Sequence, residues 1–201
     1  MGKIVISQQI SLDGVVEDPS GVEGTSRGGW VNEMSRADRD LWTEHEFAES
    51  VAADALLLGR RSDAWFAARW RERTGEWADR LNTMPKYVVS STIDEPQWGN
   101  ATVLSGDVVE QVAELRAGPD SEIVVYASAV LVRTLIDHDL VDELRLTIHP
   151  FVVGTGPRLW GETADRKAFR LAESRLLGSL PHLIFSSTAG SPRHDHERID
   201  A

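Results

Sequence analysis

Two adjacent arginines and a hydroxyl residue follow a short apolar stretch in the second quarter of the chain. Residues 55–58 read Ala-Leu-Leu-Leu, which is typical of a strand buried on both faces of a parallel sheet. Gly59 permits a tight exit from this strand, and the next three residues, Arg60, Arg61 and Ser62, then fall at the start of a helix. Free backbone N–H groups favour an anion there, and guanidinium groups bind phosphate in a bidentate way. The pattern indicates a phosphate site, and a strand–helix junction with two solvated arginines fits it equally well.

Two further predicted strands also end in small or hydroxyl-bearing residues. These residues are Ser90, Ser91 and Thr92 at the end of a strand over 85–92, and Ala127, Ser128 and Ala129 after a central strand over 122–126. Ser128 is predicted to cap the helix that follows. Ligands of an open α/β sheet bind at the carboxyl ends of its strands, so three such ends together can hold an extended nucleotide. The chain lacks a G-x-G-x-x-G motif after its first strand, a P-loop and a G-x-S-x-G elbow.

The composition limits the classes of function. A length of 201 residues with 41% hydrophobic residues suits one ordinary domain. The net charge of −11 argues against nucleic-acid and membrane-surface binding, so a phosphate ligand needs a local cluster of positive charge. The absence of cysteine excludes disulfides and a cysteine nucleophile, and the scattered histidines have no metal-ligand spacing, so no metal site is expected. With no signal-peptide core and no membrane-length apolar run, we expect a cytoplasmic protein.

The rest of the chain alternates predicted strands and helices, which indicates an α/β sheet with parallel crossovers. The further elements are a strand over 3–10, a helix over 36–53, a strand over 101–104, a helix over 107–116, a strand over 144–153 and a closing antiparallel pair over 169–176 and 183–187. The glycine-rich stretch 17–34 is a long loop whose Trp30 either closes over a ligand or pins the loop to the core. Residues 67–82 are predicted to be an exposed helix end and loop.

The helix over 36–53 is predicted to bury one apolar stripe. That stripe consists of Leu41, Ala48, Val51 and Ala52, with Trp42 and Phe47 beside it. The acidic residues of the same helix are predicted to form mostly its solvated face; they are Asp38, Asp40, Glu44, Glu46 and Glu49.

Five segments together resemble the dihydrofolate reductase superfamily, in the branch related to the C-terminal reductase domain of the bifunctional riboflavin-biosynthesis deaminase/reductase. The matching segments are Ser11-Leu12-Asp13-Gly14, residues 54–62, 86–92 and 125–135, and residues 140–150 continuing to Gly154 and Gly156. They lie in the expected order and cover most of residues 3–160. The resemblance implies one α/β domain over 1–188, with a mixed, mostly parallel sheet, flanking helices and an antiparallel C-terminal strand pair. A polar tail over 189–201 is expected to be mobile.

The resemblance also implies an NADPH-dependent oxidoreductase, in which the cofactor carries the hydride chemistry. The implied cofactor contacts are Gln9, through its backbone, and Val16 at the nicotinamide carboxamide; Gly59, Arg60, Arg61 and Ser62 at cofactor phosphates; Ser90, Ser91 and Thr92 at the adenosine-side phosphate; and Ala127, Ser128, Ala129 and Val130 at the pyrophosphate. Relatives usually have a glycine pair where this chain has Ala127 and Ser128. A β-carbon there restricts the approach of the backbone to the pyrophosphate.

The candidates for proton donation and substrate contact are Asp13, Asp38 and Thr147. Dihydrofolate reductases place a carboxylate on the helix after the mobile loop, the region of Asp38 and Asp40, although each also fits a solvated helix residue. Asp13 borders the implied nicotinamide end, where a turn-forming role is the alternative. Thr147 is expected to point from a central strand toward the same pocket.

The implied reaction is hydride transfer to a small nitrogen heterocycle or a ribosylamino-pyrimidine. The nearest named activity is 5-amino-6-(5-phosphoribosylamino)uracil reductase of riboflavin biosynthesis. The alternatives are a pteridine reductase of the dihydrofolate type and a non-catalytic NADP(H)-binding module. Relatives suggest a homodimer, while the sequence does not name the substrate.

Overall fold

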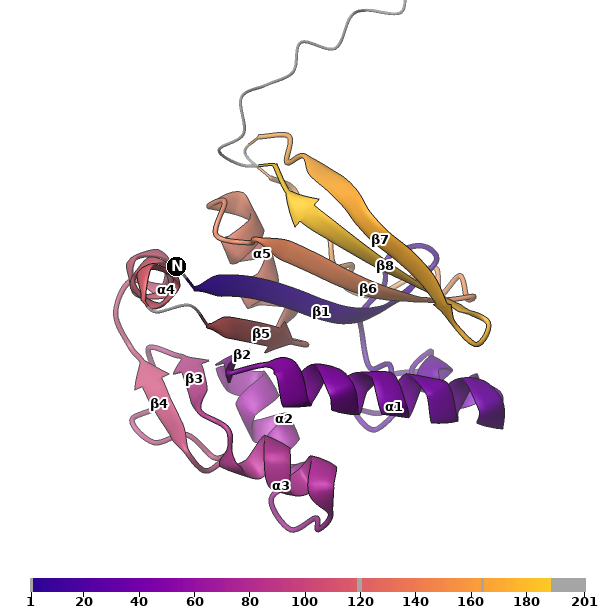
Figure 1. Cartoon of the computed structure of the whole chain (residues 1–201), viewed down its shortest axis with the longest axis horizontal. Helices are drawn as coiled ribbons and strands as arrows, with labels where there is room; N and C mark the ends of the chain where they lie inside the picture. The colour runs from indigo at the N-terminus through magenta and orange to yellow at the C-terminus, as the bar shows by residue number, and fades with distance from the viewer. Residues whose placement is uncertain (1, 119–120, 164, 189–201) are drawn as a thin grey trace, which may run out of the picture.

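A single eight-stranded sheet runs through the computed structural model, which describes residues 2–118, 121–163 and 165–188 (Figure 1). The strand order is β4-β3-β2-β5-β1-β6-β8-β7. The parallel strands are β1 (Lys3–Ser11), β2 (Ala55–Gly59), β3 (Lys86–Val89), β4 (Ala101–Leu104), β5 (Glu122–Tyr126) and β6 (Glu143–His149). The antiparallel edge consists of β7 (Phe169–Leu177) and β8 (Leu180–Ser187). The predicted α/β class, with its antiparallel C-terminal pair, is confirmed.

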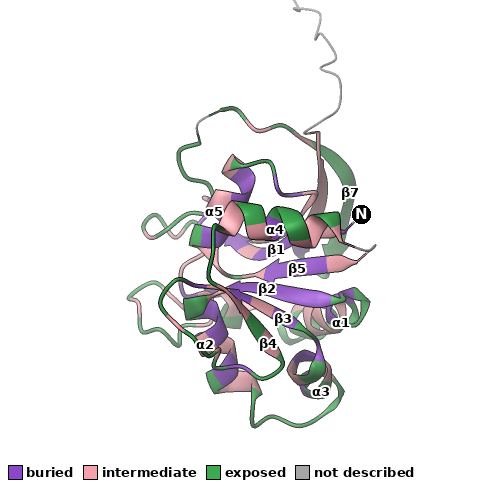
Figure 2. Ribbon diagram, turned by 90° about the vertical axis from the view of Figure 1, so that its left-hand side faces the viewer, coloured by how far each residue is buried: buried purple, intermediate pink, exposed green. Residues whose placement is uncertain are grey.

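Helices cover both faces of this sheet, and the buried strands lie between them (Figure 2). One face carries α1 (Arg36–Ala52), α2 (Arg60–Trp70) and α3 (Glu76–Thr83), and the other carries α4 (Val108–Ala117) and α5 (Ala129–Asp137). Successive residues of a strand point to opposite faces. Leu56 therefore packs in the cluster that contains Leu81 of α3, while Leu57 packs in the cluster that contains Leu135 of α5. Among the described helices, none has the length and apolar character that a membrane crossing requires.

Several predicted boundaries need correction. The strand predicted over 144–153 ends at His149, because Pro150 has no N–H to continue the ladder. The stretch predicted as loop over 67–82 contains α3, whose Ala78 and Leu81 are buried. A short 3-10 helix, η1 (Trp30–Glu33), closes the glycine-rich loop. The predicted tail over 189–201 lies outside the described residues.

Helix α1 contacts the sheet through polar side chains, so its predicted apolar face is wrong. Leu41 is 45% exposed and Val51 is 54% exposed, whereas Glu49 is only 5% exposed. The solvated face predicted for the acidic residues therefore does not hold for Glu49. The physical reason is the sheet surface beneath α1, which presents Arg145 rather than an aliphatic side chain.

Arg145 holds three carboxylates from three different elements. Its Nη1 lies 3.1 Å from Glu49 Oε2 on α1, its Nη2 donates to Glu122 Oε2 on β5 at 3.0 Å, and its Nε donates to Glu143 Oε1 on β6 at 2.6 Å. The Arg145 side chain is 13% exposed. A guanidinium group with its planar fork suits such multiple pairing. This cluster fixes the rotation of α1 above the sheet.

We predict that Arg145→Met destabilises the protein by about 3–5 kcal/mol, because the change leaves the buried carboxylate of Glu49 without its cation, while Glu122 and Glu143 keep Lys3. Urea unfolding followed by circular dichroism measures the loss. Arg170→Met on the exposed strand β7 is the matched control and should change the free energy of unfolding by less than about 0.5 kcal/mol. Equal losses in the two variants would contradict the role given to Arg145.

Candidate functional site

Strands β1 and β5 separate at their carboxyl ends. Their pairing stops at Ser7 and Tyr126, whereas β1 stays paired with β6 as far as Ser11 and His149. The chain leaves β1 toward β2 on one side and enters β6 on the other, so the connections diverge at this point of the sheet. Ligands of open α/β sheets bind at such divergences.

Two helix starts are joined beside this opening. Gly59, before α2, donates its backbone N–H to Ser128 Oγ at 3.0 Å, and Ser128, before α5, donates its own N–H to Ser62 Oγ at 3.1 Å. Ser128 is the N-cap residue of α5, as predicted, but neither its hydroxyl nor Gly59 makes a side-chain capping bond. The hydroxyl instead accepts the Gly59 N–H. The first backbone N–H groups of both helices lack intrahelical partners, as at every helix start.

Positive charge and hydroxyl groups lie at the same ends of the strands. Arg60 and Arg61 are exposed at the first turn of α2. Within the described part of the chain, neither guanidinium group makes a hydrogen bond or an ion pair. Strand β3 pairs with β2 up to Val89 and Gly59, so Ser90 follows at the neighbouring strand end. Ser90 Oγ accepts the backbone N–H of Thr92 at 3.2 Å, which shapes this turn. The arrangement can bind an anion with several oxygen atoms.

Ala127 and Ser128 both adopt the left-handed backbone conformation, with φ of 51° and 56°. Residues with a β-carbon reach this region at a cost of roughly 1–2 kcal/mol each. Gln8 helps to hold the pair in place by donating its Nε2 to Ala127 O at 2.8 Å, in addition to the two bonds of Ser128. The chain therefore keeps a glycine-type turn at the predicted pyrophosphate position although neither residue is glycine.

We predict that Ala127→Gly raises the free energy of unfolding by about 0.5–1 kcal/mol, because the relief of backbone strain exceeds the added entropy of the unfolded chain. Ala129→Gly at the start of α5 is the control, and it should destabilise the protein by about 0.5–1 kcal/mol. Both values come from urea unfolding. If Ala127→Gly destabilises the protein as much as the control does, position 127 carries no strain.

A carboxyl group lies on the other face of β1, and the sequence prediction missed it. Gln9 donates its Nε2 to Glu46 Oε1 of α1 at 2.9 Å, and Gln9 Oε1 lies 2.8 Å from His149 Nε2. The solvated role predicted for Glu46 is therefore wrong, because its carboxyl group faces the sheet. The spacing of Trp42, Glu46 and Glu49 could have indicated this burial, because the three residues lie on one stripe of the helix. That stripe faces the polar side chains of β1 and β6.

The surroundings of Glu46 favour its protonated form. Burial raises the pKa of Glu46 well above its ordinary value, and the negative charge of Glu49 raises it further, while the hydrogen bond from Gln9 acts in the opposite direction. The side chain of Glu46 nevertheless keeps partial exposure. A protonated carboxyl group is suited to donating a proton to a ligand atom within hydrogen-bond distance.

The histidines beside this carboxyl group are neutral. Burial lowers the pKa of His149 to about 4 and that of His182 to about 3. His182 Nδ1 lies 3.0 Å from Thr147 Oγ1, so the hydroxyl predicted to contact substrate is engaged inside the protein, where Thr147 is buried. Trp30 is 3% exposed and packs edge-on against His149, with ring centroids 5.0 Å apart. Of the two roles considered for Trp30, the structure shows the one that pins the loop.

Asp13 and Asp38 occupy structural turns in the ionised form. The hydroxyl of Ser11, with the backbone N–H groups of Gly154 and Val153, lowers the pKa of Asp13 to about 2. The backbone N–H and the hydroxyl of Ser179 bind Asp38 at the turn between β7 and β8 and lower its pKa. A carboxylate held in this way is a poor proton donor, so the geometry favours Glu46 over both sequence candidates.

The other predicted cofactor contacts are distributed around the opening. Val16 lies after the β1 turn and donates its backbone N–H to Pro157 O at 3.0 Å. The backbone of Gln9 belongs to the ladder with Thr147, on the side of β1 away from β5. The structure thus brings the residues around 59–62, 90–92 and 127–130 to one end of the sheet, as the order of the strands requires.

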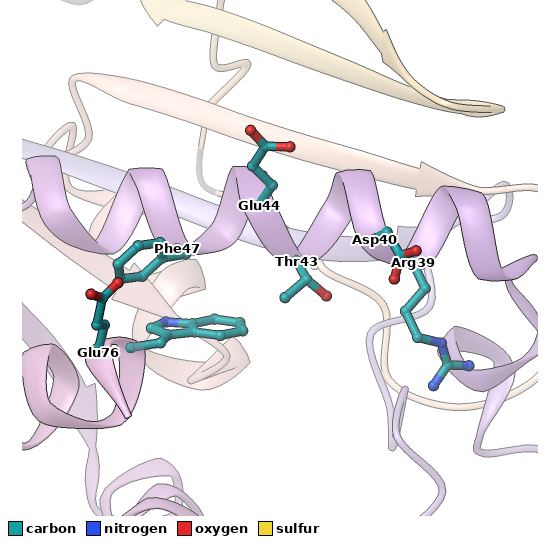
Figure 3. A pocket seen from close by; sticks show the side chains of 7 residues that line it. Arg39, Asp40, Thr43, Glu44, Phe47 and Glu76 are labelled. Carbon is teal, nitrogen blue, oxygen red and sulfur yellow. The ribbon is translucent and has the colours of Figure 1, made fainter. Parts of the chain in front are cut away.

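A groove of about 470 Å³ lies elsewhere, between α1 and α3 (Figure 3). Its lining residues are Arg39, Asp40, Thr43, Glu44, Phe47, Glu76 and Trp77. Figure 3 shows Phe47 and Thr43 on the side of α1 that faces α3, and none of the lining residues belongs to the strand ends. The described residues contain no group of three or more His, Asp or Glu side chains arranged to hold a metal ion.

Sequence comparison decides the family. Residues 2–182 match the family described as the RibD C-terminal domain. The chain belongs to the RibD C-terminal domain family. Two relatives come from Bacillus subtilis (strain 168), and both are uncharacterized proteins. YyaP is 28% identical over 88% of this chain and 90% of its own length, and YwjB is 23% identical over 91% and 97%.

Solved structures agree with this membership of the RibD C-terminal domain family. A putative riboflavin biosynthesis protein from Shewanella sp. PV-4 superposes with a TM-score of 0.67 at 21% identity, covering 92% of this chain and 98% of its own. Dihydrofolate reductase from Enterococcus faecalis, complexed with NADP(H) and RAB-propyl, gives 0.55 at 14% identity, covering 92% and 96%. The dihydrofolate reductase-like fold predicted from the sequence is confirmed. Family and fold together support a reductase-type function of the riboflavin-biosynthesis kind.

Proposed function

We propose that this protein is an NADPH-dependent reductase that transfers a hydride to a small nitrogen heterocycle or a ribosylamino-pyrimidine. The observation that carries the proposal is that two neighbouring residues of β1, Gln8 and Gln9, each contact one part of the candidate site. Gln8 binds Ala127 O beside the joined helix starts, and Gln9 binds the carboxyl group of Glu46 on the opposite face. An anion-facing turn and a protonated carboxyl group thus lie near the end of one strand, on opposite faces of the sheet.

The residues present fit a phosphate-bearing cofactor. Arg60 and Arg61 would hold its phosphates together with the free N–H groups at the start of α2, and Ala129 and Val130 would offer backbone N–H groups at the start of α5. Ser90, Ser91 and Thr92 would meet the adenosine-side phosphate. NADPH, when bound, supplies the hydride.

The protein's own part in the reaction is to deliver a proton. Reduction of a C=N bond adds a hydride to carbon and needs a proton on nitrogen, and Glu46 would donate that proton from its protonated carboxyl group. Two more polar groups, Trp42 Nε1 and Tyr126 Oη, are buried beside these carboxyl groups, where Trp42 interacts with Glu46 and Tyr126 with Glu49.

We predict that Arg60→Ala weakens NADPH binding by about 1.5–3 kcal/mol, since one charged hydrogen-bonded contact is lost. This corresponds to a rise in Kd of roughly 10–150-fold. Quenching of tryptophan fluorescence during NADPH titration measures the affinity, and Arg170→Ala on β7 is the control that should keep the wild-type Kd. Unchanged affinity in Arg60→Ala would mean that the phosphates bind elsewhere, and no quenching of the wild type at millimolar NADPH would contradict the cofactor itself.

We predict that Glu46→Gln lowers kcat for NADPH oxidation by about 10²–10⁴-fold, because the amide cannot donate the acid proton. The same variant should be more stable than the wild type at pH 7. The folded state raises the pKa of Glu46 above its unfolded value, so the ionised carboxylate destabilises the fold as pH rises above 4.5, and glutamine removes this effect.

Activity of Glu46→Gln is measured as NADPH oxidation, followed by the absorbance at 340 nm. The substrate panel consists of pyrimidines and dihydropteridines. Full activity in the stable variant would exclude Glu46 as the donor. Turnover with pteridines alone would favour the dihydrofolate-type alternative. Tight NADPH binding with no oxidation across the panel would favour a non-catalytic binding module.

A further inference from the structure

The side chain of Gln9 joins a histidine to the candidate proton donor. Its amide contains one donor group and one acceptor oxygen, and both are used: Nε2 donates to Glu46 Oε1 at 2.9 Å, and Oε1 lies 2.8 Å from His149 Nε2. Gln9 extends from β1, Glu46 from α1 and His149 from the end of β6. The three side chains form a continuous hydrogen-bond chain between the sheet and the helix.

His149 sets the direction of this chain. It is fully buried, and its Nδ1 has no hydrogen-bond partner among the described residues. If Nε2 carries the ring proton and donates to Gln9 Oε1, only a lone pair on Nδ1 remains unpaired. The flipped amide would require the proton on Nδ1, leaving a buried N–H donor without an acceptor, which is the rarer and more costly defect. The histidine therefore presents Nε2–H to Gln9, and the amide presents its N–H to Glu46.

The direction of the amide decides where the acid proton resides. Glu46 Oε1 accepts the Gln9 N–H, and a proton on this oxygen would face another donor. A protonated carboxyl group therefore carries its hydrogen on Oε2. Trp42 on the same helix also interacts with the Glu46 carboxyl group and, like Gln9, favours its ionised form. The titratable groups near Glu46 are Glu49 on the same helix and Tyr126 on β5, and neither donates to Oε1 in the described structure.

We propose that Gln9 is a positioning residue which, oriented by His149, keeps the proton of Glu46 on Oε2, ready for transfer to the substrate. The inference rests on the proposed reductase function for the final transfer, whereas the proton arrangement itself does not. Packing alone would require only the size of Gln9. Positioning requires its amide. A side chain of equal size without hydrogen-bonding groups would therefore preserve the packing and abolish the positioning.

The test compares Gln9→Met, which keeps the size and removes the amide, with the wild type. Nuclear magnetic resonance of ¹⁵N-labelled histidine reports the His149 tautomer, and ¹³C-labelled glutamate reports the titration of Glu46, assigned with Glu46→Gln. We expect a single Nε2–H tautomer in the wild type and a mixture in Gln9→Met. We also expect the Glu46 midpoint to rise in Gln9→Met, because the carboxylate loses its donated hydrogen bond. Gln8→Met, the neighbouring amide on the opposite face, should leave the Glu46 midpoint unchanged.

His149→Phe is the second variant, because it retains Gln9 and removes only the group that orients it. Both variants should lower kcat by about tenfold with little change in KM, since the donor is misplaced rather than lost. An unchanged tautomer and an unchanged Glu46 midpoint in Gln9→Met would overturn the proposal. If the resonance shifts appear as expected but the wild type oxidises no NADPH with any substrate of the panel, the proton arrangement stands and the proposed reductase function fails.

Discussion

The arginine at the centre of the sheet determines how the first helix lies. Arg145 draws Glu49 of α1 toward Glu122 and Glu143, and the helix can satisfy this contact in only one rotation about its axis. That rotation turns Leu41 and Val51 outward and brings the side of the helix that bears Glu46 over the end of β1. An apolar helix face would seal this part of the sheet. The charged contact instead maintains a polar interior where chemistry can take place.

Two consecutive residues of β1 contact different parts of the candidate site. Because neighbouring side chains of a strand point to opposite faces, Gln8 reaches the turn at Ala127 while Gln9 reaches Glu46. Both side chains are amides, which donate and accept hydrogen bonds without changing charge with pH. The strand that ends at the divergence with β5 thus fixes the anion-facing turn and the carboxyl group at once. A one-residue shift in register would exchange the two faces.

The sequence predicts most of the fold and where the strand ends lie, but not the polar contacts between distant elements. Apolar runs such as Leu56–Leu58 and helix starts after glycine or serine are local signals, so the positions of most strands and the place of Arg60 at a helix start follow from them. The burial of the Glu46 carboxyl group was missed because periodicity alone does not distinguish a solvated carboxylate from a buried one. The contact that settles it joins Glu49 to Arg145, 96 residues further along the chain. The use of the Ser128 hydroxyl was missed for the same reason, since its partner is Gly59 on another strand.

Ser128 holds the starts of α2 and α5 together beside the candidate anion site. One residue accepts the N–H that precedes α2 and donates its own to the first turn of that helix, so moving α5 away from α2 would stretch both bonds together. If a phosphate-bearing ligand binds here as proposed, it approaches a preorganised rim from the solvent side rather than by separating these helices. Such a rim loses little conformational entropy when it is filled, and association should be fast and simple, without a slow conformational phase.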